Sequence, residues 1–325
     1  MKYGEAGFDA DDLLAHLELL PPSPVLYGSG FEQQTELLEK ISGRHQLIGN
    51  NPEIVARLKS PHSFFDLLGA LQIPYPATQL TLPDDKTGWL IKRGGGSGGT
   101  HIRRGGVAAS GEYYQQEIAG EPVSVLFLAD GKSARIVGFN QQWVAPESGL
   151  PFCYGGAVSR ASVPPEAKTG MNLALQAIVG HTGLRGINSM DCMLIGNRFF
   201  VLEINPRLSA SFGLYDGPWL LREHLQACAG HLWLGDVPDF PAQAHKIIFA
   251  PAEFVVPRTM PWPTWVADIP EAGSIIKAGQ PVCSVLASAA DAASARKTVF
   301  AMGQQLEAQL HPLFLNGIHH EPHTT

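Results

Sequence analysis

The stretch Gly88–Gly106, GWLIKRGGGSGGTHIRRGG, constrains the fold of this chain more than any other. An apolar run typical of a β-strand ends in Lys92 and Arg93, and the next six residues include five glycines. A flexible linker can have this composition, but a linker needs no strand that delivers a lysine to its start. The alternative is a loop whose backbone N–H groups approach an anion, because glycine has no Cβ to block them.

Two familiar phosphate-binding loops fit this stretch poorly. Gly94, Gly96 and Gly99 have the G-x-G-x-x-G spacing of dinucleotide-binding folds, with Glu117 near the place of a ribose-binding acid. However, the residues that follow, THIRRGG, do not begin an apolar helix. The loop also lacks the Gly-Lys-Ser/Thr ending of a Walker A loop, and the chain lacks the His-Arg-Asp and Asp-Phe-Gly tripeptides of protein kinases.

A second motif, MDCMLIGNRFFVLEINPR, predicts a β-hairpin that turns at Gly196–Asn197. Residues two apart on a strand point to the same face. Glu203 and Asn205 should therefore project together, while Leu202 and Ile204 pack into the core. Asp191, in the other arm, can reach the same face from the neighbouring strand.

Two carboxylates and an amide oxygen form the all-oxygen ligand set that suits Mg²⁺, which often shares its coordination shell with substrate phosphates. Arg207 follows Asn205 by two residues and offers a forked cation for a phosphate or a developing oxyanion. The alternative, that Asp191 and Glu203 are ordinary solvent-facing strand residues, is left open by the pattern alone.

Composition excludes several classes of function. The chain has 325 residues, 45% of them hydrophobic, and a formal net charge of −7, so no global basic field predicts a nucleic acid or an anionic membrane as partner. No apolar run approaches the ~20 residues that span a bilayer, and the start, MKYGEAGFDADDLL, lacks the apolar core of a signal peptide. The four cysteines lie far apart. We expect a cytoplasmic protein with buried thiols.

The order of predicted elements gives an α+β chain in three segments. The segments PVLYGSG, FEQQTELLEKIS and HQLIG have the patterns of a strand, a helix and a strand, which predicts a small α/β unit. The helical spacing of FEQQTELLEKIS begins at Phe31. Two helices follow, and β-hairpins, a long helix, the hairpin above and a closing β segment come after them. The predicted domains are residues 1–60 (N-terminal α/β domain), 61–145 (the subdomain with the glycine loop) and 146–325 (the subdomain with the metal site and the closing β segment).

With Lys92, the glycine loop, the strand pair in YYQQEIAGEPVSV and the hairpin DCMLIGNRFFVLEINPR in this order, the sequence resembles the ATP-grasp superfamily. The ending EINPR looks most like the carbamoyl-phosphate synthetase branch. The resemblance covers most of the chain and implies the ATP-grasp fold. In that fold, a small N-terminal α/β domain precedes two α+β subdomains that sandwich ATP.

The resemblance also implies how the nucleotide is bound. Lys92 would hold the ATP phosphates, and the glycine loop would close over the triphosphate. The loop residues are Gly94, Gly95, Gly96, Ser97, Gly98 and Gly99. The segment that recognises adenine in the family matches Gln115, Gln116 and Ile118. At the position of the acid that often binds ribose in the family, this chain has Pro122, and Glu121 stands one position away.

The resemblance also implies which residues surround the reacting phosphate. Asp191, Glu203 and Asn205 match the ligands of two Mg²⁺ ions, for which Mn²⁺ is an alternative. Lys92 and Arg207 would be the catalytic cations that steady the transferring phosphate. Two departures stand out. The family has a second phosphate-binding lysine at a position that corresponds to the neighbourhood of Pro61 here, so Lys59 or His62 would replace it. D-alanine ligases have an arginine at the position of Ser189, and its absence here argues against D-alanine ligation.

The implied activity is that of a carboxylate–amine ligase, which activates a carboxylate as an acyl phosphate and releases ADP and phosphate as an amine attacks. The C-terminal block is similar to that of tyramine–glutamate ligases, which would make glutamate and tyramine or tyrosine the small-molecule substrates, in the biosynthesis of furan-type one-carbon cofactors. The alternatives are a bicarbonate-activating enzyme of the carbamoyl-phosphate or carboxylase type and a non-enzymatic ATP-binding protein. Among oligomers, a homodimer is the commonest arrangement.

Overall fold

The computed structural model describes residues 3–4, 7–85, 87–215 and 217–316 of the chain. The chain forms two compact units. The first takes in residues 1–97, 101–139 and 162–238, and the second takes in residues 98–100, 140–161 and 239–325. These limits differ from those of the three segments expected from the sequence, whose boundaries at residues 60 and 145 stay a prediction.

The N-terminal part of the first unit contains the predicted strand–helix–strand arrangement. Its elements are β1 (Tyr3–Gly4), β2 (Gly7–Phe8), α1 (Ala10–Glu18), β3 (Pro24–Val25), α2 (Thr35–Ser42) and β4 (Gln46–Leu47). Strand β3 pairs in parallel with β4, and α2 connects them. Helix α2 begins at Thr35 and not at Phe31. Phe31 instead packs against the buried cluster of Tyr27, Leu38 and Val55, ahead of the helix.

Two helices follow with one residue between them, α3 (Pro52–Lys59) and α4 (Pro61–Ala70). The Asn51 side chain caps α3 by accepting a hydrogen bond from the backbone N–H of Ile54 at 2.9 Å. Ser60 ends α3 and also caps the start of α4, where Pro61 takes the first helical position. This tight junction fixes Lys59 at the very end of α3.

A small antiparallel sheet carries the glycine loop. Its strands, in spatial order, are β5 (Thr78–Gln79), β8 (Glu112–Gln116), β6 (Trp89–Arg93) and β7 (Arg103–Arg104). Strand β6 is the predicted apolar strand, and its residues Leu90, Ile91 and Lys92 are all buried. The glycine loop leaves β6 directly after Arg93, as the sequence predicts.

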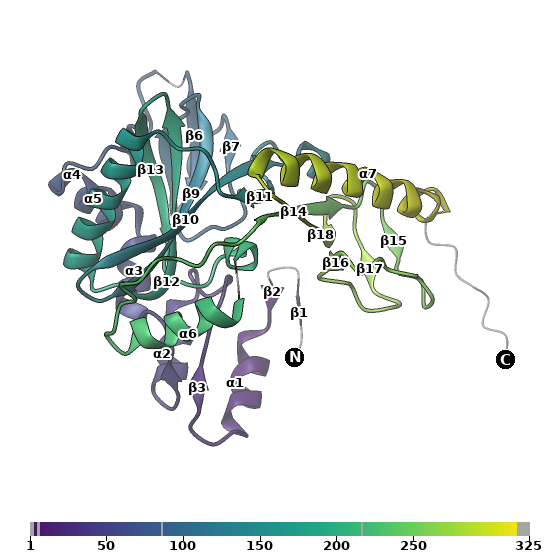
Figure 1. The fold of residues 1–325 in the computed structure, drawn as a ribbon, viewed down its shortest axis with the longest axis horizontal. Coiled ribbons are helices and arrows are strands. Elements are labelled where there is room, and N and C mark those ends of the chain that lie inside the picture. Colours follow the sequence, from purple (N-terminus) through teal and green to yellow (C-terminus); the bar gives the residue numbers. More distant parts are fainter. Residues whose placement is uncertain (1–2, 5–6, 86, 216, 317–325) are drawn as a thin grey trace. The chain divides into compact units, whose positions relative to one another are not determined.

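The larger strands of the first unit run in the order β13 (Arg198–Asn205), β12 (Arg185–Ile195), β9 (Glu121–Asp130) and β10 (Ala134–Val144). Residues 125–129 of β9 are buried without interruption, so both faces of this strand are covered. The covering helices are α5 (Pro165–Thr182), beside β13, and α6 (Gly217–Cys228), against β9 and β12 (Figure 1). The short helix η2 (Ala210–Leu214) leads into α6. The predicted hairpin turn at Gly196–Asn197 is confirmed.

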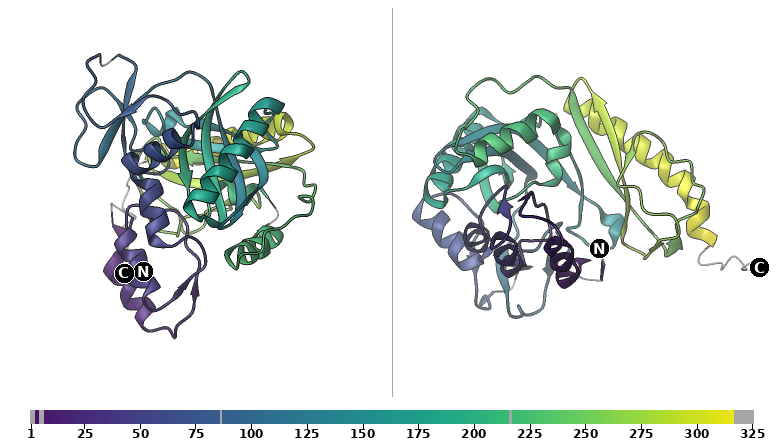
Figure 2. Two further views of the ribbon diagram at one scale, coloured as in Figure 1. Left: turned by 90° about the vertical axis from the view of Figure 1, so that its left-hand side faces the viewer. Right: turned by 90° about the horizontal axis from the view of Figure 1, so that it is seen from below.

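The second unit contains the last five residues of β10 and a C-terminal β–α layer. Its elements are η1 (Pro146–Ser148), β11 (Tyr154–Ser159), β14 (Ala242–Phe249), β15 (Phe254–Val255), β16 (Val266–Ala267), β17 (Ile275–Ile276), β18 (Pro281–Ala289) and α7 (Ala292–Asn316). The strand order is β10-β11-β14-β18-β16, and β15 pairs with β17. Helix α7 lies along β14 and β18, as the right-hand view of Figure 2 shows.

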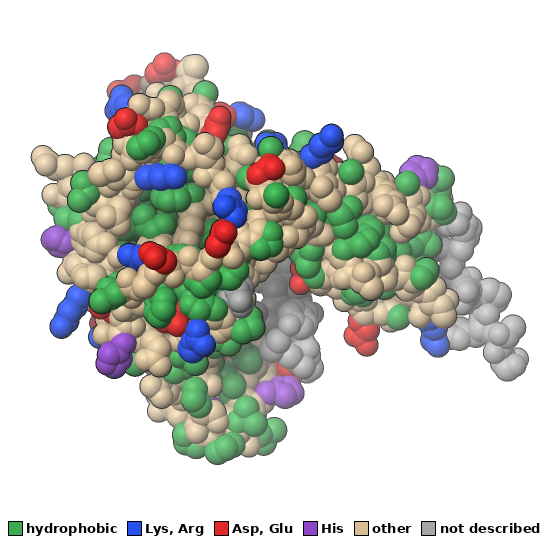
Figure 3. Space-filling model, in the orientation of Figure 1, with side chains coloured by type: hydrophobic (Ala, Val, Ile, Leu, Met, Phe, Trp, Pro, Cys, Tyr) green, Lys and Arg blue, Asp and Glu red, His purple; other side chains and the backbone are tan. Residues whose placement is uncertain are grey.

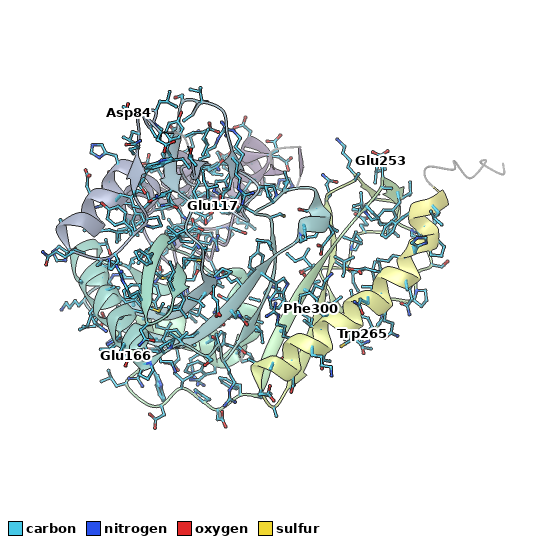
Figure 4. The ribbon with its side chains drawn as sticks, turned by 90° about the horizontal axis from the view of Figure 1, so that it is seen from above. Asp84, Glu117, Glu166, Glu253, Trp265 and Phe300 are labelled. Carbon is cyan, nitrogen blue, oxygen red and sulfur yellow. The ribbon has the colours of Figure 1, made fainter. Side chains whose placement is uncertain are left out.

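The core of the second unit lies between α7 and these strands. Phe300 of α7, labelled in Figure 4, packs its ring 5.2 Å from the ring of Trp143. Lys246 of β14 donates a hydrogen bond to Glu307 of α7 at 2.7 Å. Within the part of the chain that the structure describes, none of the helices combines the length and the apolar character needed to cross a membrane. Acidic and basic side chains are interspersed over the face drawn in Figure 3.

Candidate functional site

The side chains of Asp191 and Glu203 face each other across the hairpin of β12 and β13. The two residues are direct cross-strand partners, and so are Ser189 and Asn205. Asn205 Nδ2 donates a hydrogen bond to Asp191 Oδ2 at 2.9 Å. The structure therefore brings the three predicted oxygen-bearing side chains together on one face of the hairpin.

A β-bulge lies beside this cluster, and the sequence did not predict it. Asp191 pairs with Glu203, but Cys192 pairs with Val201, so Leu202 is the extra residue. The expected burial of Leu202 in the core is wrong, because the bulge interrupts the strict alternation of the strand and leaves this side chain only half-buried.

Lys59 brings a cation to the same face from the last residue of α3. Its Nζ donates to Glu203 Oε2 at 3.1 Å and to Asn205 Oδ1 at 2.8 Å. The Lys59 side chain is 5% exposed, whereas that of Glu203 is 35% exposed, so the carboxylate keeps an open side. His62, the other candidate to replace the second phosphate-binding lysine of the family, is 72% exposed and pairs with Asp66. Of the two candidates, only Lys59 reaches the cluster.

Lys92 of β6 is buried. Its Nζ donates to Gln115 Oε1 at 2.6 Å, and Gln115 Nε2 donates to Thr78 Oγ1 at 3.2 Å. Burial lowers the pKa of the Lys92 ammonium, and the negative charges of Glu203 and Asp191 oppose that shift. The charges of both carboxylates thus reach the Lys92 ammonium.

Arg207 is buried just beyond β13 and forms an ion pair with Glu32 from the segment before α2. Arg207 Nε donates to Glu32 Oε1 at 2.5 Å, and the Glu32 Oε2 atom accepts from the backbone N–H of Gly30 at 3.0 Å. Arg207 also reaches Asn205 Oδ1 at 3.4 Å. The predicted catalytic arginine thus adjoins the cluster, and its nearest partner, Glu32, is a residue that the sequence did not single out.

Buried Asn50 holds the segment before α3 against this hairpin. Its Nδ2 donates to Asn188 Oδ1 at 2.8 Å and to the carbonyl of Pro206 at 2.9 Å. Its Oδ1 accepts from the backbone N–H of Arg185 at 2.8 Å. A fully satisfied buried amide of this kind fixes the register between segments far apart in sequence. It helps to fix Lys59, at the far end of α3, near β13.

The glycine loop is divided between the two units. Residues 94–97 belong to the first unit, where a Cβ on Gly94 would lie 2.9 Å from Pro61 Cδ and 3.1 Å from the Lys59 carbonyl oxygen. Only a residue without a side chain can approach the α3–α4 junction so closely. Gly98 and Gly99 belong to the second unit, where the Gly98 carbonyl accepts from the backbone N–H of Tyr154 at 2.9 Å.

The segment expected to recognise adenine and ribose is less buried than the cluster. Gln115 is buried, Ile118 is half-buried, and Gln116 and Glu121 are exposed. Glu121 begins β9 and lies opposite Leu194 in the sheet. The structure brings Gln115 to Lys92. The roles of Gln116, Ile118 and Glu121 stay predictions.

Glu117, labelled in Figure 4, has a partner that fits no nucleotide-binding role. Its carboxylate accepts a hydrogen bond from Arg104 Nε of β7 at 2.8 Å. The acid that completed the apparent dinucleotide fingerprint is therefore one half of an exposed ion pair, and such pairs contribute little to stability.

Asp191 and Glu203 form a tightly coupled pair. Burial raises the pKa of Asp191, and the negative charge of Glu203 raises it further. Burial also acts to raise the pKa of Glu203, but the Lys59 ammonium overcomes this effect and holds that pKa below its usual value. The two adjacent carboxylates repel each other, and a cation bound between them would relieve this repulsion.

The donor set fits a hard divalent cation. Asp191, Glu203 and Asn205 offer carboxylate and amide oxygens, the ligands that Mg²⁺ prefers. Lys59 already bonds to two of these residues as a cation, which shows that their oxygens converge. The described residues contain no group of three or more His, Cys, Asp or Glu side chains able to hold a metal ion, so such an ion would need Asn205 and ligands from a substrate.

Residues 62–211 match the family model of the ATP-grasp domain. No protein of curated function matches the sequence. Solved structures match over nearly the whole chain, among them the pyruvate carboxylase of Rhizobium etli, with a TM-score of 0.71, 12% identity and coverage of 93% of this chain and 33% of that chain. The chain has the ATP-grasp fold.

Two further structures with this fold show its range. The biotin carboxylase domain of the Hydrogenobacter thermophilus 2-oxoglutarate carboxylase, in complex with MgADP and bicarbonate, has a TM-score of 0.69 and 12% identity, and covers 93% of this chain and 76% of that one. The L-amino acid ligase of Bacillus licheniformis has a TM-score of 0.70 and 12% identity, and covers 91% of this chain and 84% of that one. The predicted fold class is confirmed, and at these identities the likeness shows the fold alone.

Proposed function

We propose that this ATP-grasp chain is an ATP-dependent carboxylate–amine ligase. The observation that carries the proposal is the convergence of Asp191, Glu203 and Asn205 with two buried lysines, Lys59 and Lys92. Such a mixture of hard oxygen ligands and cations suits a metal-bound triphosphate. Phosphoryl transfer needs position and electrostatic stabilisation more than covalent chemistry from the protein.

Each residue of the cluster has a proposed task. Asp191, Glu203 and Asn205 would hold Mg²⁺, or Mn²⁺ in its place, and the metal would neutralise charge on the phosphates. Lys92 and Lys59 would bind phosphate oxygens, and Arg207 would steady the transferring group, with its side chain fixed by Glu32. The glycine loop would cover the triphosphate and protect the acyl phosphate from water.

Glutamate is the proposed carboxylate, and tyramine or tyrosine the proposed amine, from the similarity of the C-terminal block to tyramine–glutamate ligases. The product would enter the biosynthesis of a furan-type one-carbon cofactor. The four cysteines are free thiols, as expected in a reducing compartment, and we place this reaction in the cytoplasm.

The test is ADP release by the purified protein with Mg²⁺ and ATP, against a panel of carboxylates and amines. We expect turnover that needs both a carboxylate and an amine, with glutamate plus tyramine as the first pair. Product mass identifies the amide. Turnover with a carboxylate and no dependence on any amine would contradict ligation.

Bicarbonate activation is the second candidate, because the fold is shared with biotin carboxylase domains. It predicts ADP release that depends on bicarbonate and is indifferent to amino acids. A third outcome, tight ATP binding without turnover on any member of the panel, would favour a non-enzymatic ATP-binding protein. The same assay separates all three, since each gives a different dependence on the added substrates.

A further inference from the structure

The Lys59 ammonium bonds to the same oxygens that a metal ion would need in the proposed site. Its Nζ donates to Glu203 Oε2 at 3.1 Å and to Asn205 Oδ1 at 2.8 Å. Carboxylate and amide oxygens are also the ligands that a hard divalent cation prefers. Lys59 and a metal ion therefore compete for these atoms, because the lone pairs of each oxygen are limited and the two positive charges repel.

Asn205 Oδ1 is the atom at which this competition is strongest. An amide oxygen has two lone pairs, and this one already accepts from Lys59 at 2.8 Å and from Arg207 Nη2 at 3.4 Å. Turning the amide over would break the bond that Asn205 Nδ2 donates to Asp191 Oδ2 at 2.9 Å. It would also point the Nδ2 donor at the Lys59 ammonium. A metal ion can therefore bind Oδ1 only if one of the two cations moves away.

Lys59 is the cation that can move. It lies at the end of α3 and carries its ammonium on a flexible alkyl stem. Arg207 is held by two further bonds, because its Nε donates to Glu32 Oε1 at 2.5 Å and its Nη1 donates to the carbonyl of Leu208 at 3.2 Å. The contact of Arg207 with Asn205 is also the longer of the two. We therefore expect Arg207 to stay in place when Lys59 leaves.

The charges around the site favour this movement only when a nucleotide is present. Glu203 is paired with Lys59, and Glu32 is paired with Arg207. A divalent ion that arrived alone would add positive charge beside both cations and would leave the buried Lys59 ammonium without its carboxylate, which is costly. A triphosphate brings its own negative charge, and its oxygens are strong acceptors for the displaced ammonium.

We propose that Lys59 blocks the metal site until a nucleotide binds, an inference that rests on the metal–triphosphate site proposed above. Without a nucleotide, the ammonium stays on Glu203 and Asn205 and competes with free divalent ions. With a nucleotide, the ammonium moves to phosphate oxygens and leaves both side chains to the metal. The metal and the nucleotide then each raise the affinity for the other, by the same factor.

The experiment measures Mn²⁺ binding to the nucleotide-free protein, through the electron paramagnetic resonance signal of the free ion, in the parent and in Lys59→Met. Methionine has a similar length and neither charge nor donor. We expect Lys59→Met to bind Mn²⁺ about tenfold to 100-fold more tightly, because the ion no longer displaces a charge-assisted hydrogen bond. A merely structural role of Lys59 would give the opposite sign, since damage to the site weakens metal binding.

Two further variants serve as controls. Lys40→Met, on the exposed side of α2, changes the net charge equally and should bind Mn²⁺ as the parent does. Adding Glu203→Gln to Lys59→Met should remove the gain, which places the ion at this site. If Lys59→Met does not fold, as judged by thermal unfolding, Lys59→Leu allows the same comparison.

The second readout is the effect of a non-hydrolysable ATP analogue on Mn²⁺ affinity, corrected for ions that the analogue binds in solution. The analogue should raise this affinity in the parent, and the enhancement should shrink about tenfold to 100-fold in Lys59→Met, since the same displaced bond is involved. An unchanged or weaker nucleotide-free affinity in Lys59→Met, or an enhancement of the parent size, would overturn the proposal. A parent protein that binds no Mn²⁺ even with the analogue would instead contradict the proposed function itself.

Discussion

Lys59 and Glu203 form an ion pair at 3.1 Å although 144 residues separate them in the sequence. The pair joins the end of α3 to the hairpin that carries the candidate metal ligands. Lys59 also bonds to Asn205, so that a single ammonium touches two of the three oxygen-bearing residues. We infer that Lys59 holds these oxygens in place before a nucleotide and its metal bind.

Replacing Lys59 with alanine should therefore impair catalysis more than folding. We expect kcat/KM for ATP to fall by about 100-fold, because a cation that contacts transferring phosphates is worth a few kcal/mol. His62→Ala, three residues away, is the control and should behave like the parent. Steady-state kinetics at varied ATP concentration checks this. An unchanged kcat/KM in Lys59→Ala would remove this lysine from the site.

Glu203→Gln should abolish turnover and leave the fold intact. The substitution keeps the size of the side chain and removes one negative charge from the metal ligands. We expect a loss of at least ~1,000-fold in kcat, with a thermal unfolding midpoint close to that of the parent. Glu166→Gln on the exposed start of α5 (Figure 4) controls for loss of a carboxylate elsewhere. Activity at the parent level would contradict the metal assignment.

Lys92→Ala should raise the KM for ATP and lower kcat. Lys92 is buried beside both carboxylates, and its loss removes charge stabilisation in the ground state and in the transition state. Lys132→Ala, in the exposed turn between β9 and β10, is the matched control. If the ATP dependence of Lys92→Ala equals that of the parent protein, Lys92 does not bind phosphate.

Thr78 should act as a positioning residue for Gln115. Its hydroxyl accepts from Gln115 Nε2, which leaves the amide oxygen for Lys92. In Thr78→Val the amide loses this restraint, and we expect the KM for ATP to rise by about fivefold to tenfold, as for one lost hydrogen bond. Thr78→Ser keeps the hydroxyl and should restore the parent value. Equal KM values in the Val and Ser variants would show that the hydroxyl has no such role.

Several features of the site could be predicted from residue order alone. Strand periodicity placed Glu203 and Asn205 on one face, and the turn at Gly196–Asn197 brought Asp191 opposite them, as the structure confirms. The bulge at Leu202 could not be predicted, because nothing in the local pattern marks the extra residue. Periodicity is a local signal, and it is reliable only where the ladder of backbone hydrogen bonds is regular.

Contacts between segments that lie far apart in the sequence were harder to predict. The sequence left two candidates for the second phosphate-binding lysine of the family, Lys59 and His62. The structure places Lys59 against Asn205, whereas His62 is exposed. Glu32 carried no sequence signal, since its importance comes from its pairing with Arg207.

The most direct test of this account is a crystal structure of the protein with Mn²⁺ and a non-hydrolysable ATP analogue. Anomalous scattering locates the manganese ions without ambiguity. The account predicts ions within coordination distance of Asp191, Glu203 and Asn205 Oδ1, with phosphate oxygens in the same coordination shell and with Lys59 and Lys92 on the triphosphate. Manganese and nucleotide bound away from these three side chains would contradict it.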